Sequence, residues 1–257
     1  STLRKFPEDG EPVFQSYHAR TDPDQFRFLP SGSVGIPPVV SVYTALAYRY
    51  ARDHHLEVPE DVFFWSLIGD SEFREGSLME CMPDAAEREL GRVVWIVDYN
   101  RQNLDGTRIP NQRGLRGTDA HRMEAQGLAN GWNVIQVRHG AVRRAAFAKP
   151  GGDDLKRVLE EGFSDYELQI LLLLQDAAQT RKALLERDPG LGDLLGTMED
   201  DQVLALFQDL GGHDMDALVK ALQSAKTDLQ SPTLVIAHTV KGWGLECYAA
   251  PGNHSEL

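Results

Sequence analysis

The sequence predicts an α/β fold in which a parallel sheet is flanked by helices. Two β-rich runs, residues 61–68 and 92–98, are each followed by a short polar loop, and helical sequence lies between them. This order is typical of a βαβ unit, whose two strands run parallel. Because the carboxyl ends of parallel strands meet at one edge of a sheet, we expect the two loops to lie close together where such sheets bind ligands.

Both loops carry oxygen ligands suited to a divalent cation. Asp70 follows the first strand in a Gly-Asp-Ser loop, and Asn100 follows the second strand in an Asn-Arg-Gln loop. A carboxylate and an amide oxygen are hard ligands that suit Mg²⁺, which also takes ligands from the phosphates of a substrate. A Gly-Asp pair alone is a weak signal, since both residues are common in turns. The two loops at this separation are much more specific.

Helices and two further strands account for much of the remaining chain. The further strands are expected at residues 132–137 and 232–237. Helices are expected at residues 39–53, 75–82, 83–90, 118–128, 153–161, 164–186, 198–210 and 215–225. Pro83 divides two of these helices, because proline interrupts a helix interior. We expect a single domain over residues 1–257, within which residues 152–227 form a helical excursion.

Composition and charge restrict the function classes. A formal net charge of −13 argues against a nucleic acid partner, because phosphate backbones demand a basic face. The two cysteines, Cys81 and Cys247, have no metal-ligand spacing. The longest apolar run, residues 170–174, is too short to span a bilayer, and residues 1–33 show no signal-peptide pattern. These features predict a cytoplasmic protein with no membrane partner.

The two loops together resemble the motif with which thiamine-diphosphate enzymes hold Mg²⁺ and the diphosphate of their cofactor. Residues 100–106, Asn-Arg-Gln-Asn-Leu-Asp-Gly, are most similar to the Asn-x-Gln-x-Leu-Asp-Gly of the homodimeric pyruvate dehydrogenase family, in the transketolase-like superfamily. The segments that follow the order and approximate spacing of that family are 16–46, 61–106, 128–140 and 204–244. The resemblance covers well over half of the chain and implies the diphosphate-binding (PP) domain of a decarboxylating component.

The resemblance also implies roles for individual residues. The metal ligands would be the side chains of Asp70 and Asn100 and the main-chain carbonyl of Gln102. The residues implied to contact the cofactor are Tyr17, Ser33, Val34, Gly69, Ser71, Glu72, Asn100 and Lys241. His254 is the catalytic candidate, because the family carries a functional histidine in this neighbourhood, at a spacing that differs by two residues.

Several of these residues also have a plainer interpretation from the sequence alone. Tyr17 would be a half-buried loop aromatic, and Ser33 would cap the following helix without any ligand. Lys241 would be a surface cation, and His254 a frayed terminal residue. The family resemblance reverses this preference for Lys241, which stands in His-Thr-Val-Lys-Gly where the family has His-Thr-Ile-Lys-Gly with its lysine at the active site.

Three positions depart from the family pattern. Ser71 replaces a glycine, Val34 replaces a methionine, and Pro37 replaces a glycine. If position 71 requires a positive φ, serine would be strained there by about 1 kcal/mol or more; otherwise the change is harmless.

Two further polar groups are interpreted as structural. Arg138, His139, Arg143 and Arg144 form a basic cluster, and such a cluster is usually a solvated face. His213 lies in a Gly-Gly-His-Asp sequence and is interpreted as a capping-loop histidine; the family match makes a structural or pocket-rim role plausible.

The resemblance implies thiamine-diphosphate- and Mg-dependent decarboxylation of a 2-oxo acid, pyruvate above all, with acyl transfer to a lipoyl carrier. We expect this chain to be a half-site that needs a pyrimidine-binding domain or chain, in a homodimer or heterotetramer, with a lipoyl acyltransferase as a further partner. One alternative is transketolase-type transfer of two-carbon units between sugar phosphates, which Lys241 and the Asn-x-Gln loop disfavour. The other is a degenerate, non-catalytic assembly domain.

Overall fold

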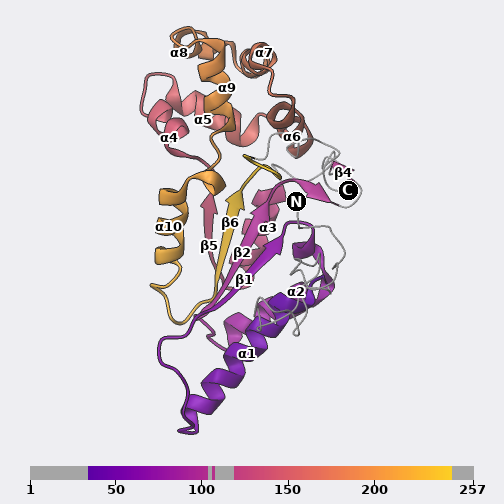
Figure 1. The fold of residues 1–257 in the computed structure, drawn as a ribbon, viewed down its shortest axis with the longest axis vertical. Helices are drawn as coiled ribbons and strands as arrows, with labels where there is room; N and C mark the ends of the chain where they lie inside the picture. Colours follow the sequence, from indigo (N-terminus) through magenta and orange to yellow (C-terminus); the bar gives the residue numbers. More distant parts are fainter. Residues whose placement is uncertain (1–33, 104–105, 108–118, 245–257) are drawn as a thin grey trace, which may run out of the picture.

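A sheet of four parallel strands forms the centre of the computed structural model, which describes residues 34–103, 106–107 and 119–244 (Figure 1). The strands are β1 (Phe64–Gly69), β2 (Val93–Tyr99), β5 (Asn133–Val137) and β6 (Thr233–His238). Their order is β1-β2-β6-β5, and each neighbouring pair is parallel. The segments that follow the strands therefore emerge at one edge, and the predicted fold class is confirmed.

Three helices cover one face of the sheet. They are α1 (Ile36–Asp53), α2 (Gly76–Glu87) and α3 (Asp119–Ala129). Alternate residues of β2 point toward these helices, as the two-residue period of a strand requires. Trp95 is fully buried among them and packs against Trp132, with ring centroids 4.5 Å apart. This packing fixes the strand from which the Asn100 loop emerges.

The opposite face of the sheet is covered in part. Helix α10 (Met215–Ser224) packs Ala221 against Val94 and Val235. Toward β1 the described residues leave this face open, and Leu67 is 75% exposed while Trp65 is 39% exposed. The apolar side chains that β1 directs to this face are therefore accessible in the described part of the chain.

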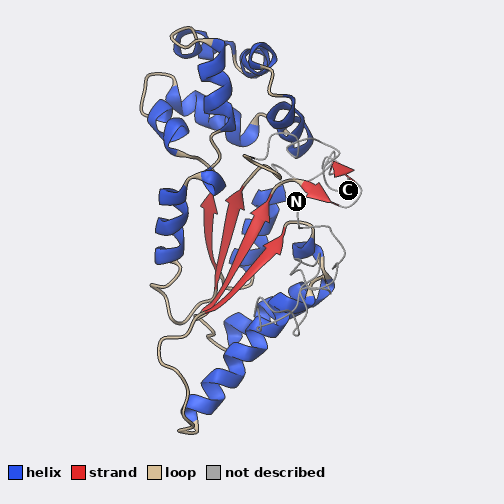
Figure 2. Cartoon of the chain, viewed as in Figure 1, coloured by secondary structure: helices blue, strands red, loops and turns tan. Residues whose placement is uncertain are grey.

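A helical layer lies over the carboxyl ends of the strands (Figure 2). Its helices are α4 (Ala141–Phe147), α5 (Gly152–Glu161), α6 (Asp165–Leu174), α7 (Ala177–Arg187), α8 (Gly192–Leu195) and α9 (Asp200–Gln208). The layer has its own apolar core, separate from the two cores on the faces of the sheet. None of the described helices has the length and apolar character needed to cross a bilayer. The layer places α6 directly above the edge where ligands bind in such sheets.

Two predicted helix boundaries are wrong. Pro83 lies inside the single helix α2, whose buried face continues past it through Ala85. Proline costs a helix about 3 kcal/mol, and packing of this face against the sheet offsets that cost. The predicted helix at 164–186 is instead divided into α6 and α7 at Gln175, which adopts a left-handed φ of 52°. Asp176 then caps α7 by accepting a hydrogen bond from the main-chain N–H of Gln179.

Candidate functional site

The two polar loops of the sequence prediction are in direct contact. Asp70 is 1% exposed, and its Oδ2 accepts a hydrogen bond from the main-chain N–H of Arg101 at 2.8 Å. The Ser71 hydroxyl donates to the main-chain carbonyl of Gln102 at 3.3 Å. Parallel pairing of β1 with β2 sets Gly69 opposite the end of β2 and produces this contact. The structure brings these residues together, and their roles as ligands stay a prediction.

Hydrogen bonds orient the amide of Asn100. Its Oδ1 accepts from the main-chain N–H of Gln102 at 2.9 Å, and its Nδ2 donates to Oδ2 of Asp98 at 3.2 Å. The other carboxylate oxygen of Asp98 accepts from the Thr239 hydroxyl. An amide or carbonyl oxygen has two lone pairs, so one accepted hydrogen bond still leaves capacity for a cation. The oxygens of Asn100 and Gln102 can therefore serve beside the Asp70 carboxylate.

The donor set at this edge suits a hard cation. Among the described residues, no group of three or more His, Cys, Asp or Glu side chains is arranged to hold a metal. A cation here would instead take one carboxylate, from Asp70, with the amide of Asn100 and the main-chain carbonyl of Gln102. Such an all-oxygen set with few charges is what Mg²⁺ uses when phosphates and water complete its shell.

The start of α1 docks onto the first loop through Gly35. Its φ of 84° is left-handed, and a Cβ there would lie 2.7 Å from Cβ of Glu75. Its N–H donates to Oε1 of Glu72 at 2.9 Å, and its carbonyl accepts from the Ser77 hydroxyl at 3.2 Å. These contacts bring Val34, which is 59% exposed, beside the loop that contains Asp70. Two segments of the predicted cofactor site thus meet.

Glu72 has a role that the sequence did not reveal. Its carboxylate accepts from Gly35 and also from the main-chain N–H of Gly69 at 3.2 Å, so it links the α1 entrance to the end of β1. The negative charge lies at the amino end of α1, where the helix dipole stabilises it. Ser71 has a φ of −75°, so serine in place of glycine is not strained at this position.

Lys241 lies on the same side of the site. A small pocket beside the second loop is lined by Asn100, Gln102, Gln169, Leu172, Leu173, Thr239, Val240 and Lys241. His213 holds the segment that carries Lys241, because its Nε2 accepts from the main-chain N–H of Val240 at 2.8 Å and its ring stacks on Trp243. Burial lowers the pKa of His213, which keeps Nε2 an acceptor. The structural role expected for this histidine agrees with these contacts.

Three predicted site residues, Tyr17, Ser33 and His254, lie outside the described residues. Their roles as cofactor contacts and as the catalytic histidine stay predictions.

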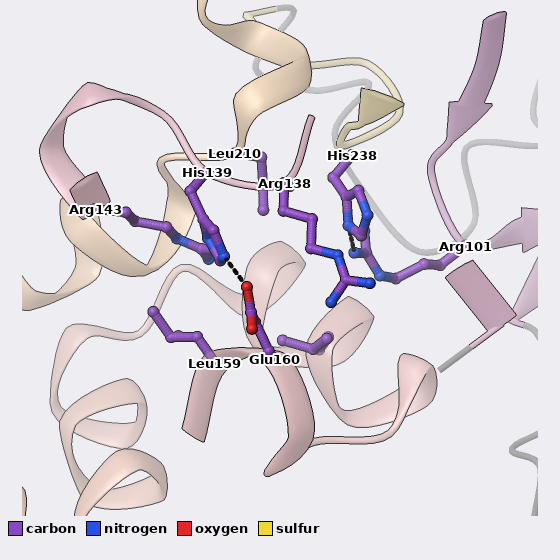
Figure 3. A pocket seen from close by; sticks show the side chains of 9 residues that line it. Arg101, Arg138, His139, Arg143, Leu159, Glu160, Leu210 and His238 are labelled. Carbon is purple, nitrogen blue, oxygen red and sulfur yellow. Dashed lines mark hydrogen bonds and ion pairs between the residues drawn. The ribbon is translucent and has the colours of Figure 1, made fainter. Parts of the chain in front are cut away.

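The basic cluster is buried in part, which corrects the expectation of a solvated face. Arg143 is 3% exposed and donates to the main-chain carbonyls of Leu206, at 3.1 Å, and Phe207. Burial lowers the pKa of Arg143 to about 9. His139 binds Glu160 through Nε2 at 2.8 Å (Figure 3). Among the four residues of the cluster Arg144 is solvated as expected. The sequence interpretation failed because it did not predict the short helix α4, which directs Arg143 against α9 inside the helical layer.

A second buried network joins the helical layer to the loop of Asn100. Arg101 is 2% exposed and donates through Nη2 to Nδ1 of His238 at 2.9 Å (Figure 3). Its Nε lies 3.4 Å from Oδ1 of Asp165 on α6, and Asp165 also accepts from the Tyr99 hydroxyl. Burial and the neighbouring Arg101 hold the pKa of His238 well below its ordinary value. Sequence reasoning missed Arg101, which occupies a variable position of the motif.

Curated proteins resemble this chain over nearly its whole length. It is 27% identical over 246 residues to the pyruvate dehydrogenase E1 component of Buchnera aphidicola, a match that covers 95% of the chain. It is 28% identical over 238 residues to that of Corynebacterium glutamicum, and 26% identical over 229 residues to that of Escherichia coli. The chain is similar to pyruvate dehydrogenase E1 components. The resemblance read from the sequence is thereby confirmed.

Each match covers most of this chain but only about a quarter of the E1 component. The chain spans 26%, 24% and 25% of the lengths of these three E1 components and 95%, 93% and 89% of its own. No protein-family model matches the chain. Among solved structures, transketolase from Pichia stipitis aligns with a TM-score of 0.47 and 17% identity, over 86% of this chain and 21% of that one. Transketolase from Leishmania mexicana aligns with a TM-score of 0.44 and 18% identity, over 84% of this chain and 21% of that one.

Proposed function

We propose that this chain supplies the diphosphate-binding half of the active site of a thiamine-diphosphate- and Mg-dependent enzyme. The reaction is decarboxylation of a 2-oxo acid, pyruvate above all, with acyl transfer to a lipoyl carrier. The observation that carries the proposal is the contact between the loops of Asp70 and Asn100 at the carboxyl ends of neighbouring parallel strands. Similarity to pyruvate dehydrogenase E1 components over 95% of the chain supports it.

The residues of the two loops would share the work of holding cation and cofactor. Asp70, the amide oxygen of Asn100 and the carbonyl of Gln102 would hold Mg²⁺, because all three belong to loops in mutual contact. Main-chain N–H groups of Ser71 and Glu72 and the ammonium of Lys241 would bind the diphosphate. Gly69, Tyr17, Ser33 and Val34 would be further cofactor contacts.

Thiamine diphosphate supplies an electron sink for the loss of CO₂ from a 2-oxo acid. The two loops and Lys241 would orient and neutralise the diphosphate of the cofactor, whereas its reacting ring needs further groups. His254 is the proposed catalytic residue of this chain. We infer that a pyrimidine-binding domain or chain completes the site, in a homodimer or heterotetramer, and that a lipoyl acyltransferase receives the acyl group. A cytoplasmic location is part of this proposal.

Calorimetry with the 257-residue chain tests the cation and cofactor assignment. We expect thiamine diphosphate to bind in the presence of Mg²⁺ and not in EDTA, and Asp70→Ala to weaken binding at least ~100-fold because it removes the one charged ligand. Asp70→Asn keeps an acceptor for the N–H of Arg101 and should fold while losing the same affinity. Asp201→Ala changes an exposed carboxylate on helix α9 and serves as the control. Unchanged binding by Asp70→Asn, or binding in EDTA, would refute the proposal.

Turnover assays separate the candidate reactions. The purified chain alone should not turn over pyruvate, and pyruvate should be consumed once the complementary half is added. Activity on sugar phosphates with that half would favour the transketolase-type alternative instead. The sequence features that favour the decarboxylase over that alternative are Lys241 and the Asn100-x-Gln102 loop. Absence of thiamine diphosphate binding would favour the degenerate assembly domain.

A further inference from the structure

Asp98 interrupts an apolar face of strand β2. Alternate residues of a strand share one face, so Asp98 follows Val94 and Ile96, which pack in the apolar cluster beneath α10. Asp98 is half-buried and lies at the carboxyl end of the strand, where the loops of Asp70 and Asn100 emerge. A carboxylate in such a place needs hydrogen-bond donors, because burial without them is costly. The donors that it finds come from the candidate site.

Three segments of the candidate site form hydrogen bonds with Asp98. The main-chain N–H of Asp70 donates to its main-chain carbonyl at 3.3 Å, and Nδ2 of Asn100 donates to its Oδ2 at 3.2 Å. The hydroxyl of Thr239, two residues before Lys241, donates to its Oδ1. Both oxygens of the carboxylate thus accept from protein donors. Asp98 is therefore a junction between the two loops and the segment that carries the lysine.

The contact with Asn100 decides which end of its amide is available to a cation. The two ends of an asparagine amide have nearly the same shape, but one accepts hydrogen bonds and the other donates them. An ionised carboxylate only accepts, so Asp98 selects the Nδ2 end. The Oδ1 end accepts from the main-chain N–H of Gln102 at 2.9 Å and keeps a second lone pair. Both contacts demand the same orientation of the amide, and a rotated amide would present N–H groups that repel a cation.

We propose that Asp98 is a positioning residue: it holds the amide of Asn100 with its oxygen toward the cation that the loops of Asp70 and Asn100 would bind. This inference rests on the proposed function. Residues that orient metal ligands typically change metal affinity by about 10- to 100-fold when they are replaced. Asp98 acts on the cation through Asn100, and the hydroxyl of Thr239 holds the carboxylate of Asp98 in turn.

Titration of the full 257-residue chain with Mn²⁺, followed by electron paramagnetic resonance, tests the inference. We expect Asp98→Leu, which offers Asn100 no acceptor, to weaken Mn²⁺ binding at least about tenfold. Asp98→Asn removes the charge but keeps an oxygen that accepts from Nδ2 of Asn100. It should therefore bind Mn²⁺ at least about fivefold more tightly than Asp98→Leu. Equal affinities of the two variants would overturn the inference, because the carboxylate would then act through its charge alone or not at all.

The side-chain amide of Asn100 offers a readout that a purely structural role of Asp98 would not change. Its NH₂ signal in proton–nitrogen NMR spectra can be identified by its absence in Asn100→Ala. In the metal-free wild type the two hydrogens of this group should be well separated in chemical shift, because one of them is hydrogen-bonded to Asp98. The separation should be smaller in Asp98→Leu. An unchanged separation would show that Asp98 does not hold the amide and would overturn the inference.

A matched control lies at the amino ends of the strands. There Nδ2 of Asn133 donates to Oδ2 of Asp228 at 2.8 Å, so the same two groups pair at the opposite edge of the sheet. Asp228→Leu should lower the melting temperature, because main-chain N–H groups of Gln230 and Ser231 also lose their acceptor. It should keep wild-type Mn²⁺ affinity. A loss of Mn²⁺ affinity as large as that of Asp98→Leu would assign both losses to general destabilisation and overturn the inference.

The same titrations separate this inference from the proposed function. Wild-type Mn²⁺ affinity in Asp98→Leu overturns the inference and leaves the proposed function intact. Failure of the wild-type chain to bind both Mn²⁺ and thiamine diphosphate overturns the proposed function as well.

Discussion

The two halves of the sheet edge differ in how their buried polar side chains are hydrogen-bonded. At β5 and β6, Arg143 donates to main-chain carbonyls and His238 lies between Arg101 and Gln136, with distances of 2.9 Å to each. Beside the loop that follows β2, the amides of Gln102 and of Gln169 on α6 keep unpaired atoms within the described residues. Polar residues at a ligand edge are therefore not equivalent. Side chains whose hydrogen bonds end on protein stabilise the fold, whereas a buried atom without such a bond needs another partner, such as water or a ligand.

Removal of the Arg143 side chain should have the largest effect and should affect stability alone. Arg143→Met leaves the buried carbonyls of Leu206 and Phe207 without a donor, so the free energy of unfolding should fall by about 3 kcal/mol. Urea denaturation measures this change. Arg144→Met breaks an exposed ion pair with Asp214 and should cost less than about 1 kcal/mol. Equal effects of the two variants, or lost thiamine diphosphate binding in Arg143→Met, would contradict the division between the two halves.

Gly35→Ala tests the docking of α1 in the β1–β2 half. The left-handed φ costs alanine about 1 kcal/mol, and the new Cβ would lie 2.7 Å from Cβ of Glu75, so we expect a loss of about 2 kcal/mol in the free energy of unfolding. Thiamine diphosphate binding should weaken too, because Val34 moves. Gly244 has a φ of 77° and no neighbour within 4 Å, so Gly244→Ala should show the backbone cost alone. An identical loss in the free energy of unfolding for the two variants would mean that Glu75 moves away from the new Cβ at no cost.

Acid should destabilise the β5–β6 half through His238. The pKa of His238 is lower in the folded state than in the unfolded state, so the unfolded chain binds the proton at a higher pH. The contribution of His238 to the free energy of unfolding is therefore present above the unfolded pKa of about 6.5 and is lost as the pH falls below it. One such group contributes at most ~1.4 kcal/mol per pH unit. Urea denaturation between about pH 7.5 and pH 5 covers the range in which imidazole groups titrate. The free energy of unfolding should change less with pH in His238→Asn than in wild type. An unchanged slope would show that His238 does not control acid sensitivity.

Ser71→Ala should have the smallest effect. It removes one partly buried hydrogen bond to the carbonyl of Gln102, so the free energy of unfolding should fall by about 1 kcal/mol or less. Affinity for Mn²⁺ should stay within about threefold of wild type, since a neutral hydroxyl adds little charge at the cation. A tenfold change in either direction, seen by electron paramagnetic resonance, would show that this hydroxyl takes part in cation binding.

The strands and their shared edge were predictable because they depend on local pattern. Apolar runs ending in polar loops gave β1 and β2 within a few residues, and parallel pairing then required Asp70 and Asn100 to lie close together. The loops also carry a motif whose spacing is specific. Contact between Asp70 and the residue after Asn100 agrees with that expectation.

Features set by long-range packing were not predictable. Gln169 lies in a leucine-rich helix, and nothing in the local sequence shows which loop lies opposite it. The carboxylate of Glu72 meets Gly35 across 37 positions of sequence. Arg143 was expected to be solvated because charged residues are usually exposed. In the structure its guanidinium donates to main-chain carbonyls near the end of α9. In each case the deciding partner came from another element.

Arg101 belongs to both halves of the edge. Its left-handed φ of 67° turns the main-chain N–H toward Asp70, while its guanidinium reaches His238. A proton on that imidazole would repel the guanidinium of Arg101, whose main-chain N–H donates to Asp70. One residue thus joins the loop of Asp70 to the packing around His238, so a substitution at Arg101 would disturb both.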